Sequence, residues 1–553
     1  QEKAYAEIAN SGGSFGTRKH TLAFGTGLHN NFELNARLSN IASDGFVDRA
    51  SSNLFGYFFN VNYVTEKTLI KAIAFGGKEK TYQAWYGLED PEKLRNDRTF
   101  NPAGMYFDEN GNMQFYDDET DNYAQNHFQL HWSQKWSDKW VSNAALHYTI
   151  GKGYFEQYRE DETLADYNLP DFQGNSVSDL VRKRWLDNDF FGAVFSLNYK
   201  TPKTDVMLGG AANRYLGDHF GEVVWTQYYV PAANRYYNNI GNKDDVNVYA
   251  KASQQFGKLN VFADLQYRMV FYEATSFRFD DVNDTFRFFN PKLGLNFDFN
   301  DKHSFYGYFG VANKEPRRDD YENGSTKPER LFDYELGWKY QSKKVNISAN
   351  AFYMNYQNQL VLTGALNDVG SPIFTNSGKS YRVGLEVESV IALSDKWIVN
   401  PNVTFSQNKN RDFVFQRDGV LQNLGNTTIA FSPDWVIGNR ITYSPVKALQ
   451  LSLFSKFVSD QYMGNIDSDR SKLDAYFVND LNVSYEWKIN KGVKSIVFSA
   501  LINNLFNLEY ESNGYFYTYD DDWTTPGSVT TIEGAGFYPQ AGINFLAGAT
   551  IKL

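Results

Sequence analysis

The end of the chain, Gln540–Leu553, alternates between two kinds of side chain and constrains the fold more than any other stretch. Its odd positions are all apolar, whereas its even positions are mostly polar or small. Successive side chains of a strand point to opposite faces of a sheet, so this period of two predicts a strand with one apolar face. The strand is longer than the roughly 9–11 residues that a tilted strand needs to cross a bilayer.

A strand that exposes an apolar face to lipid must not leave its backbone hydrogen-bonding groups unpaired. The final strand therefore has to pair with the first one, which we place near Ala4–Ser11. The same alternation recurs along the chain, and we expect about 22 strands, the size of a barrel with a plugged lumen. The fold class is all-β, a transmembrane antiparallel β-barrel that occupies residues 1–553.

The alternating positions also predict which face of each strand meets lipid. Charged side chains are costly on the lipid face and must point into a wet interior. We therefore expect Lys456, Glu486, Lys488 and Asn544 in the lumen, and Leu451, Leu481 and Phe545 outside.

The connections between the expected strands alternate between short and long, which is typical of periplasmic turns and extracellular loops. Turns such as 65–68, 201–204 and 393–396 are short, and both termini fall on their side. The long connections are Lys80–Asp121, Lys152–Leu186, Leu216–Asp244, Glu315–Arg330, Val361–Lys379 and Phe506–Pro539.

Composition supports a membrane barrel and excludes several other classes of protein. Aromatic residues make up 17% of the chain, which suits aromatic girdles. No apolar run is long enough for a helical span. Cysteine is absent, which excludes thiolate chemistry, and the net charge of −11 argues against a nucleic-acid partner. Since no Ser/His/Asp set stands out either, we expect no enzyme.

The segment Leu501–Tyr510, LINNLFNLEY, resembles the penultimate-strand signature of the TonB-dependent outer-membrane receptors of Gram-negative bacteria. Val311–Tyr321, Lys327–Leu331, Phe15–Lys19 and Asp44–Phe46 support the resemblance, which covers the chain as the family's barrel. It implies a multi-pass barrel in the outer membrane and TonB-dependent uptake of a scarce large solute, most often an iron–siderophore complex.

Family members place a plug domain before the barrel, whereas here the first strand begins within the first few residues. We therefore expect that the plug is missing from this chain, either because the chain is a fragment, because the plug is removed, or because the barrel works with a plug that is supplied separately. The partners that the resemblance implies are the plug, TonB acting through it, a metal-chelate ligand, and membrane lipid with lipopolysaccharide. A surface lipoprotein or another assembly partner is a further alternative.

Arg317 and Arg318 are the first candidate binding residues. Adjacent guanidinium groups suit bidentate capture of a carboxylate or phosphate on an anionic ligand. The alternative is that the pair balances the charges of Asp319, Asp320 and Glu322.

Aromatic residues in the last long loop are the second set of candidates. Tyr515, Tyr517, Tyr519 and Trp523 could line a vestibule for the ligand. Their alternation is equally consistent with a hairpin that extends above the membrane.

Metal sites find little support in the sequence. His127 and His131 lie on one expected strand, about 13 Å apart at the rise of a strand, which is too far to share an ion. Acidic runs such as 117–121 and 520–522 could hold calcium, or they could simply be solvated loop residues. We expect no other cofactor.

Several functions stay open at this stage. His219 is the one histidine in a long connection that we place clearly outside, which disfavours haem without excluding it. Cobalamin and glycan uptake are alternatives within the same class of receptor. From other classes, the barrel could be a passive channel or a structural partner in a larger outer-membrane assembly.

Overall fold

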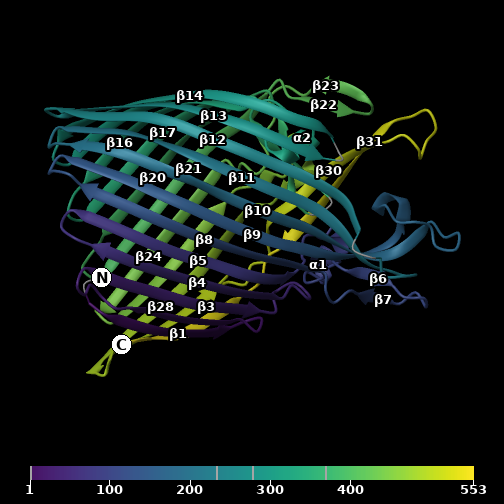
Figure 1. The fold of residues 1–553 in the computed structure, drawn as a ribbon, viewed down its shortest axis with the longest axis horizontal. Coiled ribbons are helices and arrows are strands. Elements are labelled where there is room, and N and C mark those ends of the chain that lie inside the picture. The colour runs from purple at the N-terminus through teal and green to yellow at the C-terminus, as the bar shows by residue number, and fades with distance from the viewer. Residues whose placement is uncertain (1–2, 232–233, 277–278, 368–369) are drawn as a thin grey trace.

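The computed structural model describes residues 3–231, 234–276, 279–367 and 370–553. Within these residues, one antiparallel sheet of 22 strands curves into a barrel (Figure 1). The first half of the wall consists of β1 (Tyr5–Gly13), β2 (Arg18–Gly25), β3 (Phe32–Ser43), β4 (Ser52–Val64), β5 (Thr68–Tyr82), β8 (Thr120–Lys135), β9 (Trp140–Thr163), β10 (Val177–Lys200), β11 (Thr204–Thr226), β12 (Asn234–Phe256) and β13 (Leu259–Ser276). The second half consists of β14 (Phe279–Asn300), β15 (His303–Lys314), β16 (Glu329–Gln341), β17 (Val345–Gln357), β20 (Lys379–Ala392), β21 (Trp397–Arg411), β24 (Trp435–Val446), β25 (Leu449–Val458), β28 (Tyr476–Lys491), β29 (Val493–Asn503) and β32 (Asn544–Lys552).

The barrel closes as the sequence predicts, because β32 pairs with β1. Ile8 lies opposite Ile551 and Gly12 lies opposite Ala547 in this antiparallel register. The last strand is shorter than the expected Gln540–Leu553. The backbone before it is bound elsewhere, since the N–H of Ile543 donates to the side chain of Asn507, 2.8 Å away.

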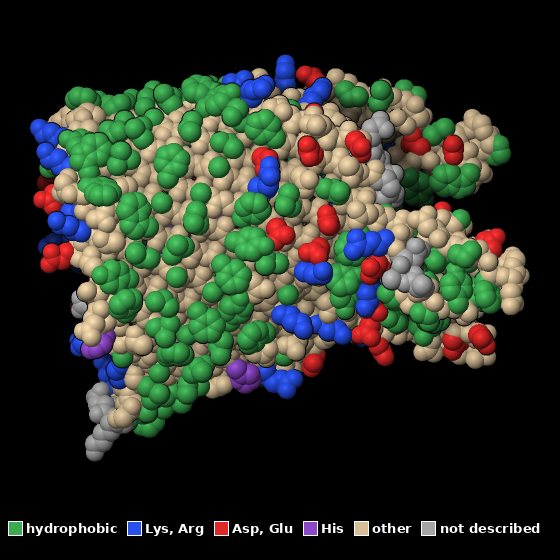
Figure 2. All heavy atoms as spheres, viewed as in Figure 1, with side chains coloured by type: hydrophobic (Ala, Val, Ile, Leu, Met, Phe, Trp, Pro, Cys, Tyr) green, Lys and Arg blue, Asp and Glu red, His purple; other side chains and the backbone are tan. Residues whose placement is uncertain are grey.

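The two faces of the wall follow the expected alternation. Trp487 and Phe545 are exposed on the outside, where Figure 2 shows hydrophobic side chains spread over the wall. Phe545 lies opposite Ile502, whereas Asn544 lies opposite Asn503. Opposed residues of neighbouring strands share a face, so the polar partners lie on the lumen side.

The connections alternate in length, so the barrel has a turn end and a loop end. Figure 1 shows the N- and C-termini together at the turn end, as predicted. Two of the expected long connections are wrong in extent, because β9 continues to Thr163 and β10 begins at Val177. Likewise, β11 continues to Thr226 and β12 begins at Asn234. Beyond the lipid the apolar alternation ends while the hydrogen-bonded ladder continues, so the pattern underestimates these strands.

Short elements occupy the loop end. The helical ones are α1 (Pro91–Asn96), α2 (Arg318–Glu322), η1 (Leu164–Tyr167) and η2 (Asp469–Ser471). The hairpins outside the wall are β6 (Met105–Phe107) with β7 (Met113–Phe115), β18 (Leu360–Leu366) with β19 (Pro372–Asn376), β22 (Val414–Arg417) with β23 (Val420–Asn423), β26 (Gln461–Tyr462) with β27 (Lys472–Leu473), and β30 (Glu511–Asp521) with β31 (Thr530–Pro539). No helix among the described residues is both long and apolar enough to cross a membrane.

Compact packing is found at the loop end. One buried cluster joins Met463 and Leu473 to Phe516 and Ala535, so the 459–475 connection packs against the β30–β31 hairpin. Another joins Tyr272 of β13 to Tyr321 of α2. These clusters fix the loops relative to one another and to the wall, which makes this end a defined surface.

Candidate functional site

The β18–β19 hairpin, residues 359–378, projects from the wall at β17 and β20, and we call it the strap. Near its tip, Gly370 has a φ of +73°, and a Cβ atom placed there would lie 2.8 Å from Cβ of Trp85. Trp85 belongs to the connection between β5 and β8, far from β17 and β20 in strand order. The strap therefore links two distant parts of the wall across the mouth of the barrel.

The β30–β31 hairpin reaches the same connection, 83–119. Leu88 forms a β-bridge with Phe537, and the hydroxyl groups of Tyr515 and Tyr517 donate to the two carboxylate oxygens of Glu89, at 2.8 and 3.1 Å. Burial raises the pKa of Tyr515, and the hydrogen bond to Glu89 raises it further, so this hydroxyl stays protonated and donates. Connection 83–119 thus binds both hairpins, and together they roof the mouth.

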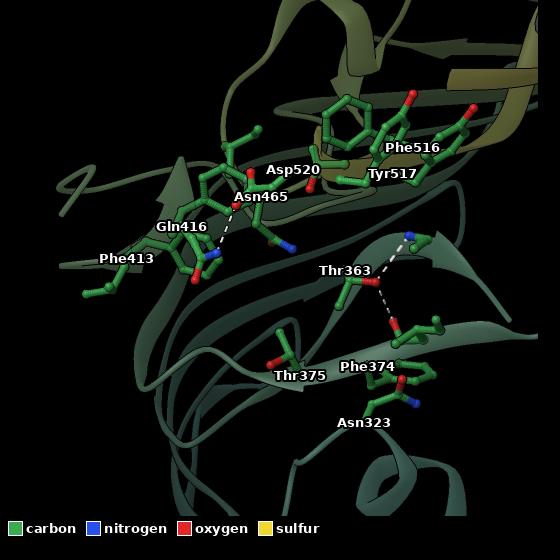
Figure 3. Close-up of a pocket in the computed structure, with 17 residues that line it drawn as sticks. Asn323, Thr363, Phe374, Thr375, Phe413, Gln416, Asn465, Phe516, Tyr517 and Asp520 are labelled. Carbon is green, nitrogen blue, oxygen red and sulfur yellow. Dashed lines mark hydrogen bonds between the residues drawn. The ribbon is translucent and has the colours of Figure 1, made fainter. Parts of the chain in front are cut away.

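A cavity of about 640 Å³ lies between the hairpins, and we call it the outer cleft. Figure 3 shows Phe374 and Thr375 of the strap on one side of it, and Phe516, Tyr517 and Asp520 of β30 on the other. Gln416 from the β22–β23 hairpin donates to Asp520 over 2.8 Å. Aromatic rings and amide groups therefore dominate the walls of the outer cleft.

Of the predicted aromatic residues, Tyr515, Tyr517 and Tyr519 lie on β30, and Trp523 lies in the turn that follows it. The hairpin interpretation of their alternation is therefore correct, and two of them also line the outer cleft. Tyr517 and Tyr519 face this cavity, whereas Tyr515 is buried beneath it. Four aromatic rings form a row in which consecutive centroids are 6.3, 6.5 and 5.7 Å apart, in the order Tyr515, Tyr517, Tyr519 and Trp523. Trp523 ends this row and is exposed to solvent.

A second cavity of about 400 Å³, the inner pocket, lies against the lumen face of β5 and β8–β12. One row of residues along its wall runs across these strands, with each residue directly opposite the next on the neighbouring strand. The row is Glu79, Tyr123, Gly153, Leu186, His219 and Asn239. The opposite side is closed by Arg318, Asp319 and Glu322 of α2 and by Asn367 and Ser371 of the strap.

The two candidate arginines point to different places. They lie at the start of a helix, where Arg317 is the N-cap, and not on a strand. Arg318 lines the inner pocket, 3.2 Å from Asp319 and 3.5 Å from Glu322. Its Nε and Nη1 atoms are buried without a hydrogen-bond partner. Arg317 instead lies over the ring of Phe374, 5.1 Å from the centroid. The structure therefore brings only Arg318 into the inner pocket.

A buried ion cluster holds the segment that carries these arginines. Glu315 is 5% exposed and bonds to Lys243, and it also accepts from both terminal nitrogens of Arg268, at 2.8 and 2.9 Å. Arg268 donates at the same time to Asp245 of β12. Because the acid and the bases come from three separate elements, this cluster fixes the start of the α2 segment to the wall.

The structure places the three histidines considered above on strands of the barrel wall. His219 is not in a loop: it lies on β11 and lines the inner pocket. His127 and His131 lie on β8, as expected, and bond separately to Thr149 and Gln129.

The acidic runs have partners within the protein. Asp118 pairs with Lys80, and Asp521 accepts from the backbone N–H groups of Trp523 and Thr524. Among the residues that the structure describes, no group of three or more His, Cys, Asp or Glu side chains is placed to hold a metal ion. Calcium in the acidic loops stays a prediction.

Sequence reasoning missed Trp85, Glu315 and Gly370. Glu315 precedes the arginine pair, yet nothing in the sequence connects it to Lys243 or Arg268. Trp85 lies in the first long connection without any periodic pattern. Only Gly370, next to a polar stretch, carried a turn signal that could have been used.

A closed barrel with an apolar outer belt, a polar lumen face and a roofed loop end defines the class of outer-membrane transport barrels. The model of the family "TonB dependent receptor-like, beta-barrel" matches residues 74–505, well over half of the chain. The protein belongs to this family, which comprises receptors and not enzymes, and its location is the bacterial outer membrane. The loop end accordingly faces the exterior.

Individual relatives are more distant. The Pesticin receptor of Yersinia enterocolitica is 27% identical over 192 residues, which is 34% of this chain and 26% of that receptor. The chain thus matches about a quarter of the length of this curated relative. The siderophore receptor PiuA from Acinetobacter baumannii has a TM-score of 0.74 at 13% identity and is covered to 82%. The ferric yersiniabactin uptake receptor FyuA from Yersinia pestis has a TM-score of 0.71 at 12% identity and is covered to 80%. Each structure is matched over 100% of this chain, and the likeness concerns the fold.

Proposed function

We propose that this barrel is the membrane-spanning part of a receptor that takes up a scarce large solute, an iron–siderophore complex, with energy delivered by TonB. The observation that carries the proposal is the roofed mouth. Residues of the strap line both the outer cleft and the inner pocket, and the barrel belongs to a family of receptors.

The lumen must be closed for such a receptor to work, because an open barrel of this width would leak. We propose that a plug domain occupies the lumen of the working receptor and that TonB acts through it. The relatives whose printed names refer to siderophores and ferric yersiniabactin support the choice of an iron chelate as the solute.

Arg318 is the residue that we assign to ligand binding in the inner pocket. The guanidinium group of Arg318 lines this pocket and can donate to oxygen atoms of a chelate, and hydrogen bonds from a charged donor contribute about 1.5–3 kcal/mol each. A change of 1.4 kcal/mol corresponds to a factor of ten in affinity. Replacing both Arg317 and Arg318 by Ala should therefore weaken binding at least about tenfold.

The test measures binding and TonB-dependent uptake of the natural chelate by the full-length receptor, with each arginine replaced singly and together. Arg318→Ala should account for most of the loss, since Arg317 lies outside the inner pocket and serves as the matched control. Barrel assembly, followed by heat-modifiability, should not change. Unchanged affinity in the double variant would remove both residues from the site. Absence of TonB-dependent uptake for any chelate would refute the proposed function.

A further inference from the structure

The loop end of the barrel carries a strong excess of acidic residues. Connection 83–119 contains nine Asp and Glu against three Lys and Arg. Connection 459–475 contains four against two, and 504–543 contains six against none. The first and third segments belong to the roof of the mouth and the second packs against it, so a solute that approaches from outside meets a negative surface.

The turn end has the opposite sign. The turns at 65–67, 136–139, 201–203, 257–258, 301–302, 342–344, 393–396 and 447–448 together contain nine Lys against four Asp and Glu. The acidic excess is thus confined to one end of the barrel and is not a property of its whole surface. A charge separation along the axis orients the field of the protein toward the exterior.

The inner pocket continues this negative surface inward. Four carboxylates and two guanidinium groups line it. Arg318 is balanced by its contacts with Asp319 and Glu322. Glu79 and Asp121 lie near each other on the lumen face of β5 and β8, and neither forms an ion pair among the described residues. The net charge of the lining is therefore negative, despite the arginines.

The outer cleft has a different lining that favours the same kind of solute. Its walls contain several aromatic rings and the carboxylate of Asp520, and none of the described residues that line it is Lys or Arg. Two of these rings already have a cation beside them, since Arg317 lies over Phe374 and Arg417 lies over Phe415. The face of an aromatic ring attracts cations through its quadrupole, and more strongly when the cation is partly desolvated. The other rings of this cleft, such as those of Tyr517 and Tyr519, and the carboxylates of the inner pocket thus favour the same sign of charge.

We propose that the solute of this receptor is a metal chelate with a net positive charge, which rests on the proposed uptake function. A polyanionic chelate would be repelled by the roof and would then meet Glu79 and Asp121. A cationic chelate is attracted by the roof and by these two carboxylates. Arg318 can still donate hydrogen bonds to uncharged oxygen atoms of such a chelate. Low-dielectric walls focus such fields in a cleft and raise the local concentration of counter-ions.

The test uses three ferric complexes of one linear trihydroxamate. The form with a free terminal amine carries charge +1, the N-acetyl form is neutral and the N-succinyl form carries −1. Binding to the full-length receptor in lipid nanodiscs is followed by quenching of tryptophan fluorescence at low and high salt. The cationic complex should bind at least about tenfold more tightly than the anionic one at low salt. A charged cleft raises the local concentration of ions of opposite charge, and their association rate, by a factor of about ten or more. The ratio should fall as salt screens the field.

A charge-neutral variant tests the assigned residues. Glu79→Gln with Asp121→Asn should reduce the preference for the cationic complex, whereas Glu66→Gln with Asp138→Asn at the turn end should not change it. A tighter anionic complex, or equal affinity or equal absence of binding for all three, would overturn the inference. A charge preference that persists without TonB-dependent uptake would instead refute the proposed function alone.

Discussion

One close contact between the strap and the rest of the mouth involves a single glycine, Gly370. Gly370 has a positive φ, and the space beside its Cα is filled by Trp85. Trp85 in turn stacks edge-on against Phe155 of β9 at 5.2 Å, and its carbonyl accepts a hydrogen bond from Tyr538. This tryptophan therefore connects the strap, the wall and the β30–β31 hairpin, and any side chain at position 370 would separate them.

Replacing Gly370 by Ala should release the strap from connection 83–119. Gly378 provides the matched control, because it also has a positive φ (+76°) but nothing lies within 4 Å of its added Cβ. Both substitutions carry the backbone penalty of a left-handed conformation, about 1–2 kcal/mol, and only Gly370→Ala adds the clash with Trp85. Hydrogen exchange of residues 359–378 should increase clearly more in Gly370→Ala. Equal exchange in the two variants would show that the contact does not hold the strap.

At the scale of elements, connection 83–119 ends on a buried carboxyl group. Glu119 is 3% exposed and accepts a hydrogen bond from the backbone N–H of Tyr158 at 3.0 Å. Burial raises the pKa of Glu119 from its usual 4.5 to about 7, against the opposing effect of this hydrogen bond. Because the pKa is raised in the folded state, the contribution of Glu119 to stability is full below pH 4.5 and is lost as pH rises through about 7.

The packing of connection 83–119 should therefore loosen between about pH 4.5 and 7. Limited proteolysis of this connection should become faster over that range, and Glu119→Gln, which stays neutral, should remove the dependence. Asp108 in the same connection is exposed and accepts hydrogen bonds from the backbone of Asn110 and Asn112, which hold its pKa low. Asp108→Asn is the control and should leave the pH dependence intact. A dependence that survives in Glu119→Gln would assign it to another group.

At the scale of the whole molecule, the lipid-facing belt and the lumen face alternate residue by residue. Leu130 on β8 is 47% exposed and lies between Ala72 and Leu146 of the neighbouring strands. Gln129 precedes it and faces the lumen. A charge inserted at these two neighbouring positions enters lipid in one case and the wet interior in the other.

Leu130→Lys should lower the free energy of unfolding in lipid vesicles by about 2–4 kcal/mol, the cost of Lys near the bilayer midplane. Gln129→Lys, one residue away, should change it far less. Denaturant titration with refolding into the same vesicles measures both values. Similar losses at the two positions would contradict the assignment of inner and outer faces.

The sequence determined the barrel itself. Period-two alternation fixes which residues face lipid, and the requirement that no strand edge stay open in a membrane leaves closure of Gln540–Leu553 onto Ala4–Ser11 as the one solution. These are local and repeated signals, so the number of strands, the order of short and long connections and the family resemblance at Leu501–Tyr510 could all be read before the structure.

Tertiary structure alone decided how the loops meet. Contacts such as Trp85 with Gly370 and Glu89 with Tyr515 join residues several hundred positions apart, and no periodic pattern encodes them. The sequence did not predict how far β9–β12 extend beyond the lipid. Both faces of these strands are solvated there, so the alternation of apolar and polar residues ends. The separation of Arg317 from Arg318 follows from the short helix that begins between them, which turns one side chain toward Phe374 and the other into the inner pocket.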